Sequence, residues 1–396
     1  MHISDKIKNL APYAFAEVNN LVDQLKSEGV DVIDFGVGDP LDPTPAFIRE
    51  ALTPAANEHA AAGYPSYIGL PKFRQKCAEW MQNRFGVTLD PETEITSHIG
   101  SKEAIFNFPE AIINPGDYVL CPSPGYPPYK QGTKFAEGIP YFYPLLPEND
   151  FFPDLDEIPE EIAAKAKIMW VCYPNSPSGK NATREMYEKV YAFCQKHNII
   201  MASDEPYSEI YFSEEAPISA LSVGKKGIIV FNSLSKRSRM TGYRVGFAAG
   251  DPEIIATFRK LRTNIDSGTP NFVQEAAIVA LSDETHVAEA RAEYAERLTI
   301  MQEALQSIGL PPNTTEGTFY MWQQVPEGET SLTFAKKLLD PAIGVVVTPG
   351  ELISEECEYK GQTINPGKYF VRFALVPTLD QVQKAAERIK TLKLTK

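Results

Sequence analysis

Short apolar runs alternate along the chain with segments of helical periodicity. The segments 13–28, 72–85 and 184–197 carry apolar residues every three or four positions, which predicts amphipathic helices. Five runs of mostly apolar residues lie between or beyond them, at 118–121, 168–172, 199–202, 228–231 and 245–249. Nearly continuous apolar runs are typical of strands that are buried on both faces. The pattern therefore predicts an α/β fold with a mostly parallel mixed sheet covered by helices.

The character of the chain changes near residue 290. A long, strongly charged helix is expected over 284–308, followed later by a strand-like segment at 369–375 and a helical segment at 379–392. This part is predicted to form a smaller α+β domain, and the helix at 13–28 is expected to pack with it. The predicted division is an N-terminal arm with its helix, a large domain and a small C-terminal domain, at 1–40, 41–290 and 291–396.

Composition narrows the class of protein. The chain has 396 residues, of which 43% are hydrophobic and 23% are charged, as is ordinary for a globular enzyme. Its net charge of −14 argues against nucleic acid as a partner, because a phosphate backbone selects basic surfaces. No run approaches the roughly 18 apolar residues of a membrane helix, and the opening MHISDKIKNL lacks a signal-peptide core. A cytoplasmic protein without a membrane partner is therefore expected.

The cysteines and histidines show no metal-binding pattern. There are five of each, with no C-x-x-C pair and no H-E-x-x-H motif. The cysteines are expected to be reduced thiols, and no metal is expected.

Polar and aromatic residues follow four of the five apolar runs. The chain continues as PSPGYPPY after 118–121, as YPNSPSG after 168–172, as SDEPY after 199–202 and as NSLSKRSR after 228–231. In open α/β sheets, ligands bind beyond the carboxyl ends of the strands. We therefore expect these four segments to form one site.

Lys236 lies in the most distinctive of these segments, SLSKRSRMTGYRVGF at 233–247. Neighbouring cations, here Arg237, Arg239 and Arg244, and a position near a buried strand end lower the pKa of a lysine and favour its neutral amine. A neutral amine attacks a carbonyl group to form a Schiff base. The alternative interpretation is a solvated basic turn.

The same segment offers groups that bind phosphate. Ser233 and Ser235 supply hydroxyls, and Arg244 is able to contact two phosphate oxygens at once. Earlier in the chain, Gly100 and Ser101 open a predicted helix, whose free backbone N–H groups favour an anion. The plainer alternative there is an ordinary helix cap.

Asp204 follows the run 199–202, and Tyr207 comes three residues later. A buried carboxylate that faces a heteroaromatic nitrogen keeps that nitrogen protonated, and a protonated pyridine is the electron sink of pyridoxal phosphate chemistry. Tyr207 would donate a hydrogen bond to the phenolic oxygen of such a ring. The alternative is a turn acid beside an ordinary tyrosine.

Two further side chains suit a flat, anionic ligand. Tyr126 lies between Pro124 and Pro127 and presents a ring for stacking, unless the segment is only a rigid loop with core aromatics. Arg372 lies within the apolar segment YFVRFALV, where a buried arginine needs a partner. A bound carboxylate is one such partner, and an internal acid is the other.

These segments, in this order and spacing, resemble the class I and II aminotransferases of pyridoxal-phosphate fold type I over about residues 12–392. SLSKRSRMTGYRVGF is a specific match to the lysine signature of that family. VIDFGVGDP, NIDSGTPNFVQEAA and TFYMW look closest to the diaminopimelate-type aminotransferases. The resemblance implies pyridoxal 5′-phosphate as the cofactor, bound by the large domain, and a fold-type I architecture with a smaller α+β domain.

The resemblance also implies roles for individual residues. Lys236 is implied as the catalytic residue, which forms the internal aldimine and moves the proton between substrate and cofactor. Asp204 is implied to hold the pyridine nitrogen protonated, and Tyr207 to bind the phenolic oxygen. Tyr126 is expected to stack on the ring. The phosphate is expected to contact Ser101, the backbone of Lys102, Ser233, Ser235 and Arg244.

Two more implied roles concern the substrate and a partner subunit. Arg372 is implied to clamp the α-carboxylate of the substrate, together with the backbone at Gly38. Tyr64 matches a tyrosine that reaches the phosphate of the neighbouring subunit, which implies a homodimer with shared active sites. Candidates to line the substrate pocket are Tyr13, Phe15, Tyr64 and Tyr67.

One segment departs from the family pattern. The family shows Asn-Pro-Thr-Gly, whereas this chain has Ser-Pro-Ser-Gly at 176–179, preceded by Asn175. Ser176 is shorter than the asparagine that binds the phenolic oxygen in the family. Either Asn175 replaces that donor after a small backbone shift, or a water fills the gap, while Tyr207 still serves the oxygen. Loss of one donor is expected to raise the pKa of the internal aldimine.

The predicted activity is reversible amino transfer between an L-amino acid and a 2-oxo acid in amino acid biosynthesis. Glutamate and 2-oxoglutarate are expected as one substrate pair, with ping-pong kinetics. The alternatives are a carbon–sulfur β-lyase or another fold-type I enzyme and, less favoured, a regulatory protein that binds the cofactor. Aromatic, alanine-like, diaminopimelate-like and basic amino donors all stay open.

Overall fold

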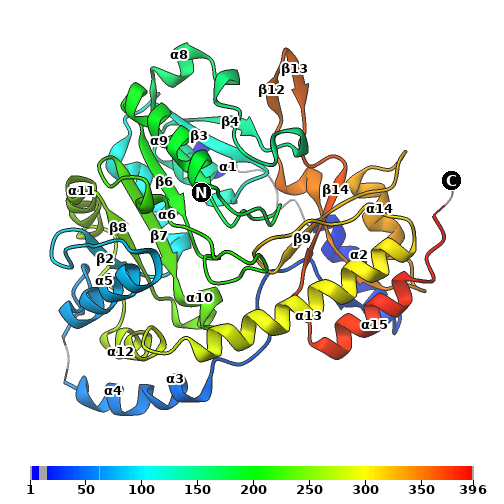
Figure 1. Ribbon diagram of the computed structural model, residues 1–396, viewed down its shortest axis with the longest axis horizontal. Coiled ribbons are helices and arrows are strands. Elements are labelled where there is room, and N and C mark those ends of the chain that lie inside the picture. Colours follow the sequence, from blue (N-terminus) through cyan, green and yellow to red (C-terminus); the bar gives the residue numbers. More distant parts are fainter. Residues whose placement is uncertain (1, 9–15, 62, 395–396) are drawn as a thin grey trace.

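In the computed structural model, which describes residues 2–8, 16–61 and 63–394, a seven-stranded sheet occupies the centre of the larger part of the molecule (Figure 1). Its strands are β2 (Ile95–His98), β3 (Tyr118–Ser123), β4 (Ile139–Pro144), β5 (Ala166–Cys172), β6 (Ile200–Asp204), β7 (Ile228–Ser233) and β8 (Gly246–Gly250). Their order is β2-β8-β7-β6-β5-β3-β4. Neighbouring strands are parallel except at β8, which is antiparallel to both β2 and β7.

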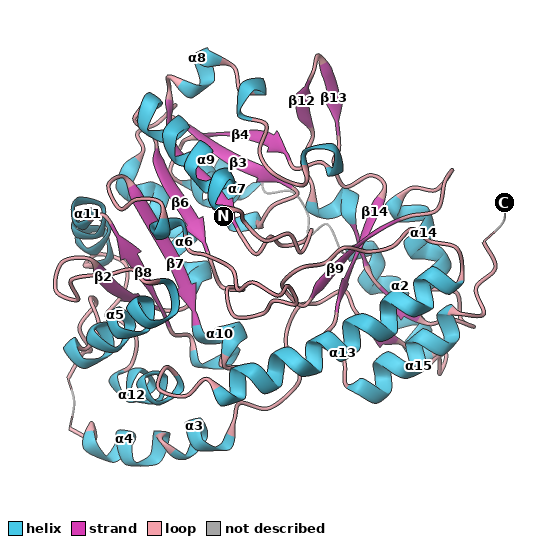
Figure 2. Ribbon diagram, viewed as in Figure 1, coloured by secondary structure: helices cyan, strands magenta, loops and turns pink. Residues whose placement is uncertain are grey.

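Helices cover both faces of this sheet (Figure 2). They are α5 (Pro71–Phe85), α6 (Ser101–Ile112), α7 (Pro127–Phe135), α9 (Arg184–His197), α11 (Pro252–Arg262) and α12 (Asn271–Ala280). Successive side chains of a strand point to opposite faces. Val230 therefore packs in a core with α5, α9 and α12, whereas Ile229 and Phe231 pack in another core with α6, α7 and α11. The predicted α/β fold with a mostly parallel mixed sheet is confirmed.

The sequence pattern located most of these elements. The predicted helices at 72–85 and 184–197 correspond to α5 and α9, and each of the five apolar runs overlaps a strand. The pattern missed β4, which contains Pro140 and Pro144. A proline lacks the backbone donor of a central strand, but it is tolerated at the edge of a sheet, where β4 lies.

The C-terminal part comprises α13 (Thr285–Ser307), β9 (Tyr320–Gln324), α14 (Ser331–Leu338), β11 (Thr348–Pro349), β14 (Phe370–Ala374) and α15 (Leu379–Ile389). The three strands form an antiparallel sheet in the order β11-β14-β9. One hydrophobic cluster joins them to the helices and includes Leu298, Phe373 and Ala386. The long helix α13 runs beside α15 (yellow and red in Figure 1). The predicted long helix, strand and final helix are thus confirmed.

The N-terminal segment contacts this C-terminal part. Val22 and Leu25 of α2 (Ala16–Ser27) pack against Leu339 and Val346. The next element, β1 (Ile33–Asp34), pairs in parallel with β10 (Val345–Val346). The three-part division of the chain into domains stays a prediction.

The remaining α-helices and strands are short. They are α1 (Asp5–Lys8), α3 (Ala46–Glu50), α4 (Leu52–Glu58), α8 (Glu160–Ala163), α10 (Leu234–Arg237), β12 (Cys357–Tyr359) and β13 (Gln362–Ile364). The last two strands form an antiparallel hairpin, and β12 packs against β4. Within the described ranges, no helix combines the length and the apolarity that crossing a bilayer requires.

Candidate active site

The carboxyl ends of β6 and β7 bring the two central groups of the site together. β6 ends at Asp204, which pairs in register with Phe231 of its parallel neighbour β7. β7 ends at Ser233, and α10 begins at the next residue, so Lys236 lies within one turn of the strand end. The Nζ of Lys236 donates a hydrogen bond to the carbonyl of Gly38 at 2.8 Å. The carboxylate and the amine therefore lie together beyond the carboxyl ends of two neighbouring strands.

The environment of Lys236 favours a neutral amine. Burial lowers the pKa of Lys236 to about 8, while the charge of Asp39 raises it and the charges of Arg244 and Arg372 lower it further. An appreciable fraction of the amine is then unprotonated near neutral pH, which is the form that attacks a carbonyl carbon. Burial rather than the neighbouring cations is the main cause.

The expectation that Arg237 and Arg239 act on this amine is wrong. Arg237 forms an ion pair with Glu284 at 2.6 Å, and Arg239 forms one with Glu293 at 2.5 Å. Their charges are compensated by these carboxylates, so of the three expected arginines only Arg244 acts on the amine.

The two oxygens of the Asp204 carboxylate have different surroundings. Oδ2 accepts a hydrogen bond from the hydroxyl of Tyr129 at 2.7 Å, whereas Oδ1 is buried and has no hydrogen-bond partner among the described residues. Burial raises the pKa of Asp204 to about 7, the bond from Tyr129 lowers it, and the charge of Glu205 raises it. A buried carboxylate oxygen without a donor is costly. This atom therefore fits a ligand that brings its own donor, such as a protonated ring nitrogen.

Aromatic side chains form the walls of the site. Tyr207 packs edge-on against Phe319 and Tyr320, with ring centroids 5.6 and 5.8 Å apart. Tyr126 is 40% exposed and packs edge-on against Tyr129 at 5.9 Å. Burial raises the pKa of Tyr207 and that of Tyr126 above the usual tyrosine value, so both phenols stay protonated donors.

The start of α6 and Arg244 form a cradle for an anion. Gly100 precedes the helix with a φ of +78°, in the left-handed region that favours glycine. A Cβ at this position would overlap the guanidinium of Arg244. The Oγ of Ser101 is buried without a hydrogen-bond partner in the described part of the chain. The helix terminus, this hydroxyl and the arginine together fit a phosphate group.

The other residues expected at the phosphate have different settings. The Oγ of Ser233 caps α10 by accepting a hydrogen bond from the backbone N–H of Ser235 at 3.1 Å. Ser235 is buried, and the side chain of Lys102 is exposed at the first turn of α6. Contacts of these three residues with a phosphate stay predictions.

Arg372 lies in the middle of β14. Its Nη2 donates hydrogen bonds to the carbonyl of Gly36 at 3.1 Å and to Oγ1 of Thr348 at 3.3 Å. Its guanidinium carbon lies 4.4 Å from the centre of the Tyr320 ring. The Nε is buried and donates no hydrogen bond to any described residue. The guanidinium is held in place with a donor to spare, which suits a planar carboxylate.

Asn175 is engaged in the structure of its own loop. Its Nδ2 donates to the carbonyl of Cys172 at 3.1 Å, and its Oδ1 accepts from the hydroxyl of Ser178 at 2.7 Å. Ser176 is half-buried. These bonds favour a water, with Tyr207, over Asn175 as the donor to a cofactor's phenolic oxygen. The roles of Asn175 and Ser176 stay predictions.

Tyr64 does not join the site within one chain. Its side chain is 91% exposed, in the loop between α4 and α5. Its predicted role requires a partner subunit and therefore stays a prediction. Tyr67, also named as a pocket residue, is 39% exposed, and Tyr13 and Phe15 lie outside the described residues.

Sequence reasoning missed two tyrosines of this site. Tyr129 follows Tyr126 by three residues at the start of α7, a spacing that places both side chains near the same end of the helix. That signal was present in the sequence. Tyr320 reaches the site because β9 pairs with β14, where Trp322 lies opposite Arg372. No local sequence pattern predicts this pairing of β9 with β14.

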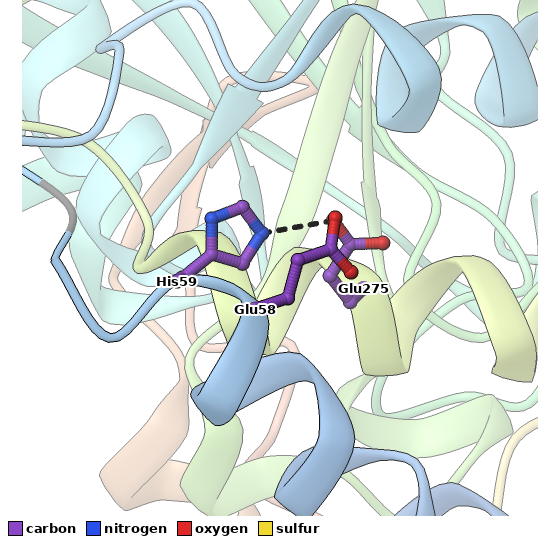
Figure 3. A group of neighbouring side chains, drawn as sticks. All are labelled: Glu58, His59 and Glu275. Atoms are coloured by element: carbon purple, nitrogen blue, oxygen red, sulfur yellow. Dashed lines mark hydrogen bonds and ion pairs between the residues drawn. The ribbon is translucent and has the colours of Figure 1, made fainter.

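A cluster of potential metal ligands lies elsewhere, between α4 and α12. Figure 3 shows Glu58, His59 and Glu275, with His59 Nε2 at 3.0 Å from Glu275 Oε1. The ammonium group of Lys72 pairs with Glu275 at 2.5 Å and with Glu58 at 3.5 Å. The lysine already compensates these carboxylates, so we interpret the cluster as an ion-pair network.

The chain is similar to known proteins over nearly its whole length. The family model of aminotransferase class I and II matches residues 30–389. An LL-diaminopimelate aminotransferase from Aquifex aeolicus is 48% identical over 99% of both chains, and one from Syntrophobacter fumaroxidans is 43% identical over 98% of both. A solved aminotransferase from Neisseria meningitidis has a TM-score of 0.90 and 34% identity, covering 98% of this chain and 99% of that one. Substrate-bound BacF from Bacillus subtilis has a TM-score of 0.89 and 32% identity, covering 100% and 99%.

Proposed function

The chain belongs to the class I and II aminotransferases, which are pyridoxal 5′-phosphate-dependent transaminases of fold type I, and we propose that its amino donor is LL-diaminopimelate. The observation that carries the proposal is the identity of 43% and 48%, over nearly the full chain, with relatives of that name. We propose 2-oxoglutarate as the acceptor, so that glutamate and 2-oxoglutarate form one pair. Both half-reactions use the same site in turn, and ping-pong kinetics are expected.

Three features of the site support binding of the cofactor. The Oδ1 of Asp204, which no described residue contacts as a donor, suits a protonated ring nitrogen. The Oγ of Ser101 and the guanidinium of Arg244 suit the phosphate, and Tyr126 offers a ring for stacking. When bound, the cofactor supplies an aldehyde that condenses with amines and a ring that withdraws electrons.

The protein's own groups position the substrate and move its proton. Arg372 would bind the α-carboxylate, because its Nε donates to none of the described residues and its Nη2 is already fixed by Gly36. That contact orients the Cα–H bond of the donor towards Lys236. The Nζ of Lys236, neutral in part because of burial, would take the proton from Cα of the donor and give it to the carbon that carries the cofactor's aldehyde. The carbonyl of Gly38 holds this amine at the edge of the site.

We also propose a homodimer with shared active sites. The support is the 91% exposure of Tyr64 together with the exposed Arg244 at the phosphate cradle, which leaves room for the partner's Tyr64. Sedimentation of the holoenzyme tests the assembly, and a monomer with full activity would contradict it. The cytoplasmic location rests on the sequence alone and stays a prediction.

A panel of amino donors with 2-oxoglutarate as acceptor tests the proposed substrate. LL-diaminopimelate is expected to give a higher kcat/KM than meso-diaminopimelate, lysine, aspartate, alanine or an aromatic amino acid. The donor should bleach the visible band of the bound cofactor, and 2-oxoglutarate should restore it. A higher kcat/KM for another donor class would overturn the substrate assignment. Release of a 2-oxo acid without bleaching would indicate a lyase.

A further inference from the structure

We propose that Tyr129 is a positioning residue, which holds Asp204 in one orientation and keeps its carboxylate ionised toward the cofactor. The inference rests on the proposed cofactor contact of Asp204. It concerns a tyrosine that is 1% exposed and has no face toward solvent.

The hydroxyl of Tyr129 is fixed by packing that does not depend on Asp204. The Tyr129 ring stacks on Trp170, with centroids 4.9 Å apart and an interplanar angle of 16°. The backbone carbonyl of Tyr129 accepts a hydrogen bond from Oγ1 of Thr133 at 2.7 Å, within α7. A hydroxyl held in this way leaves the carboxylate one preferred orientation, in which Oδ2 meets Tyr129 at 2.7 Å. The other oxygen, Oδ1, is then the one presented to a ligand.

The same bond acts on the charge of Asp204. The titratable groups that face it are Tyr129 from α7, Glu205 beside it in the chain, Cys172 opposite it on β5, and Tyr126. Burial and Glu205 raise the pKa of Asp204, whereas the bond from Tyr129 lowers it. A donor to the ionised form makes the carboxylate a weaker base. A weaker base leaves the shared proton on the ring nitrogen of the cofactor, where the electron sink requires it.

The start of α7 therefore carries two residues that would position the cofactor ring. Tyr126 is the residue before α7 and is expected to stack on the cofactor, and Tyr129 in the first turn holds the carboxylate that would bind the ring nitrogen. Any shift of this helix start would move both contacts together.

The substitution Tyr129→Phe removes the hydroxyl and keeps the stacked ring. Tyr143→Phe is the matched control, because Tyr143 is also buried and donates its hydroxyl to the backbone carbonyl of Trp170. Tyr129→Phe is expected to lower kcat roughly ten- to hundredfold, the effect of losing a hydrogen bond to a charged group, with KM changed far less. The apoenzyme should bind the cofactor more weakly. The control should match the wild type in all three quantities.

The spectrum of the holoenzyme and a double-mutant cycle add readouts that a merely structural role would not move. Without the bond from Tyr129, Asp204 is a stronger base and the ring nitrogen loses its proton more readily. A neutral ring nitrogen repels a proton at Lys236 less than a charged one does. The pH midpoint of the visible band should therefore rise in Tyr129→Phe. In the Asp204→Asn background, Tyr129→Phe should change the affinity of the apoenzyme for the cofactor little further, because the carboxylate through which it acts is gone.

Three results would overturn the inference. The first is a Tyr129→Phe enzyme with the kcat, cofactor affinity and band midpoint of the wild type. The second is a loss of activity that Tyr143→Phe shares, together with an equal fall in Tm. The third is a full further loss of cofactor affinity when Tyr129→Phe is added to Asp204→Asn. A wild-type enzyme that acquires no visible band with the cofactor would instead overturn the cofactor contact itself, and this inference with it.

Discussion

The hydroxyl of Tyr320 lies so close to the backbone of Gly38 that a Cβ at position 38 would overlap it. The same glycine accepts the hydrogen bond from the Nζ of Lys236 at 2.8 Å. Tyr320, in the C-terminal part, thus leaves no space for a side chain at position 38, whose backbone carbonyl binds the amine of Lys236.

Gly38→Ala is predicted to impair catalysis through this contact. The added methyl group must displace either Tyr320 or the backbone at position 38, and with it the carbonyl that holds Lys236. A displacement of about 1 Å at a catalytic group costs roughly a hundredfold in rate, and a loss of that size in kcat/KM is expected. Gly63→Ala is the control, because among the described residues, its two chain neighbours aside, no atom lies within 4 Å of a Cβ there. Equal kinetics for the two variants would contradict the prediction.

Attachment of the cofactor to the apoenzyme should follow the titration of Lys236. Its amine reacts only when neutral, and burial lowers its pKa from 10.5 to about 8. The rate at which the visible band appears should therefore rise as pH increases and level off above about pH 8. Stopped-flow mixing of apoenzyme and cofactor measures this rate. A midpoint at the ordinary lysine value would refute the prediction, and Lys236→Ala should form no such band and lose nearly all turnover.

Asp204 is predicted to destabilise the apoprotein as pH rises. Its pKa in the folded protein is about 7, against 3.8 as the ordinary value, so the folded state binds more protons between these values. Stability is then lost progressively from about pH 4 to pH 7, by as much as roughly 4 kcal/mol. Asp204→Asn removes this titration. Apo Asp204→Asn should therefore unfold at higher urea than the wild type at pH 7.5, with the difference vanishing near pH 4, and should be inactive as holoenzyme.

Ser176→Asn should restore a donor that the family pattern includes. The longer amide would reach the phenolic oxygen of the cofactor, which the half-buried Ser176 is too short to serve, and stabilise its negative charge. The pH midpoint of the visible band is therefore expected to fall relative to the wild type. Parallel spectroscopic titrations of the two holoenzymes provide the comparison. Identical midpoints would contradict the prediction that residue 176 affects the pH midpoint of the visible band.

Much of the fold was predictable from local patterns. The helices at 72–85 and 184–197 and the core strands carry periodicities that any packed α/β sheet must have, because one stripe or both faces are buried. The apolar pattern did not predict the edge strand β4, because an edge tolerates the prolines and half-exposed residues that a central strand excludes. The rule that ligands gather beyond strand ends also predicts that Asp204 and Lys236 lie in one site.

The sequence by itself determined which chemistry the chain carries, because the lysine, the acid and the serines follow strands whose ends must lie side by side. Only the tertiary structure decided how these groups are tuned. Tyr129 and Asp204 are 75 positions apart, and Gly38 and Lys236 are 198 apart, so their hydrogen bonds exist only once the helices and strands have packed. Packing also paired Arg237 with Glu284 instead of leaving it to act on the amine. Burial, the main cause of the lowered pKa of Lys236, is a property of the whole fold and of no single segment.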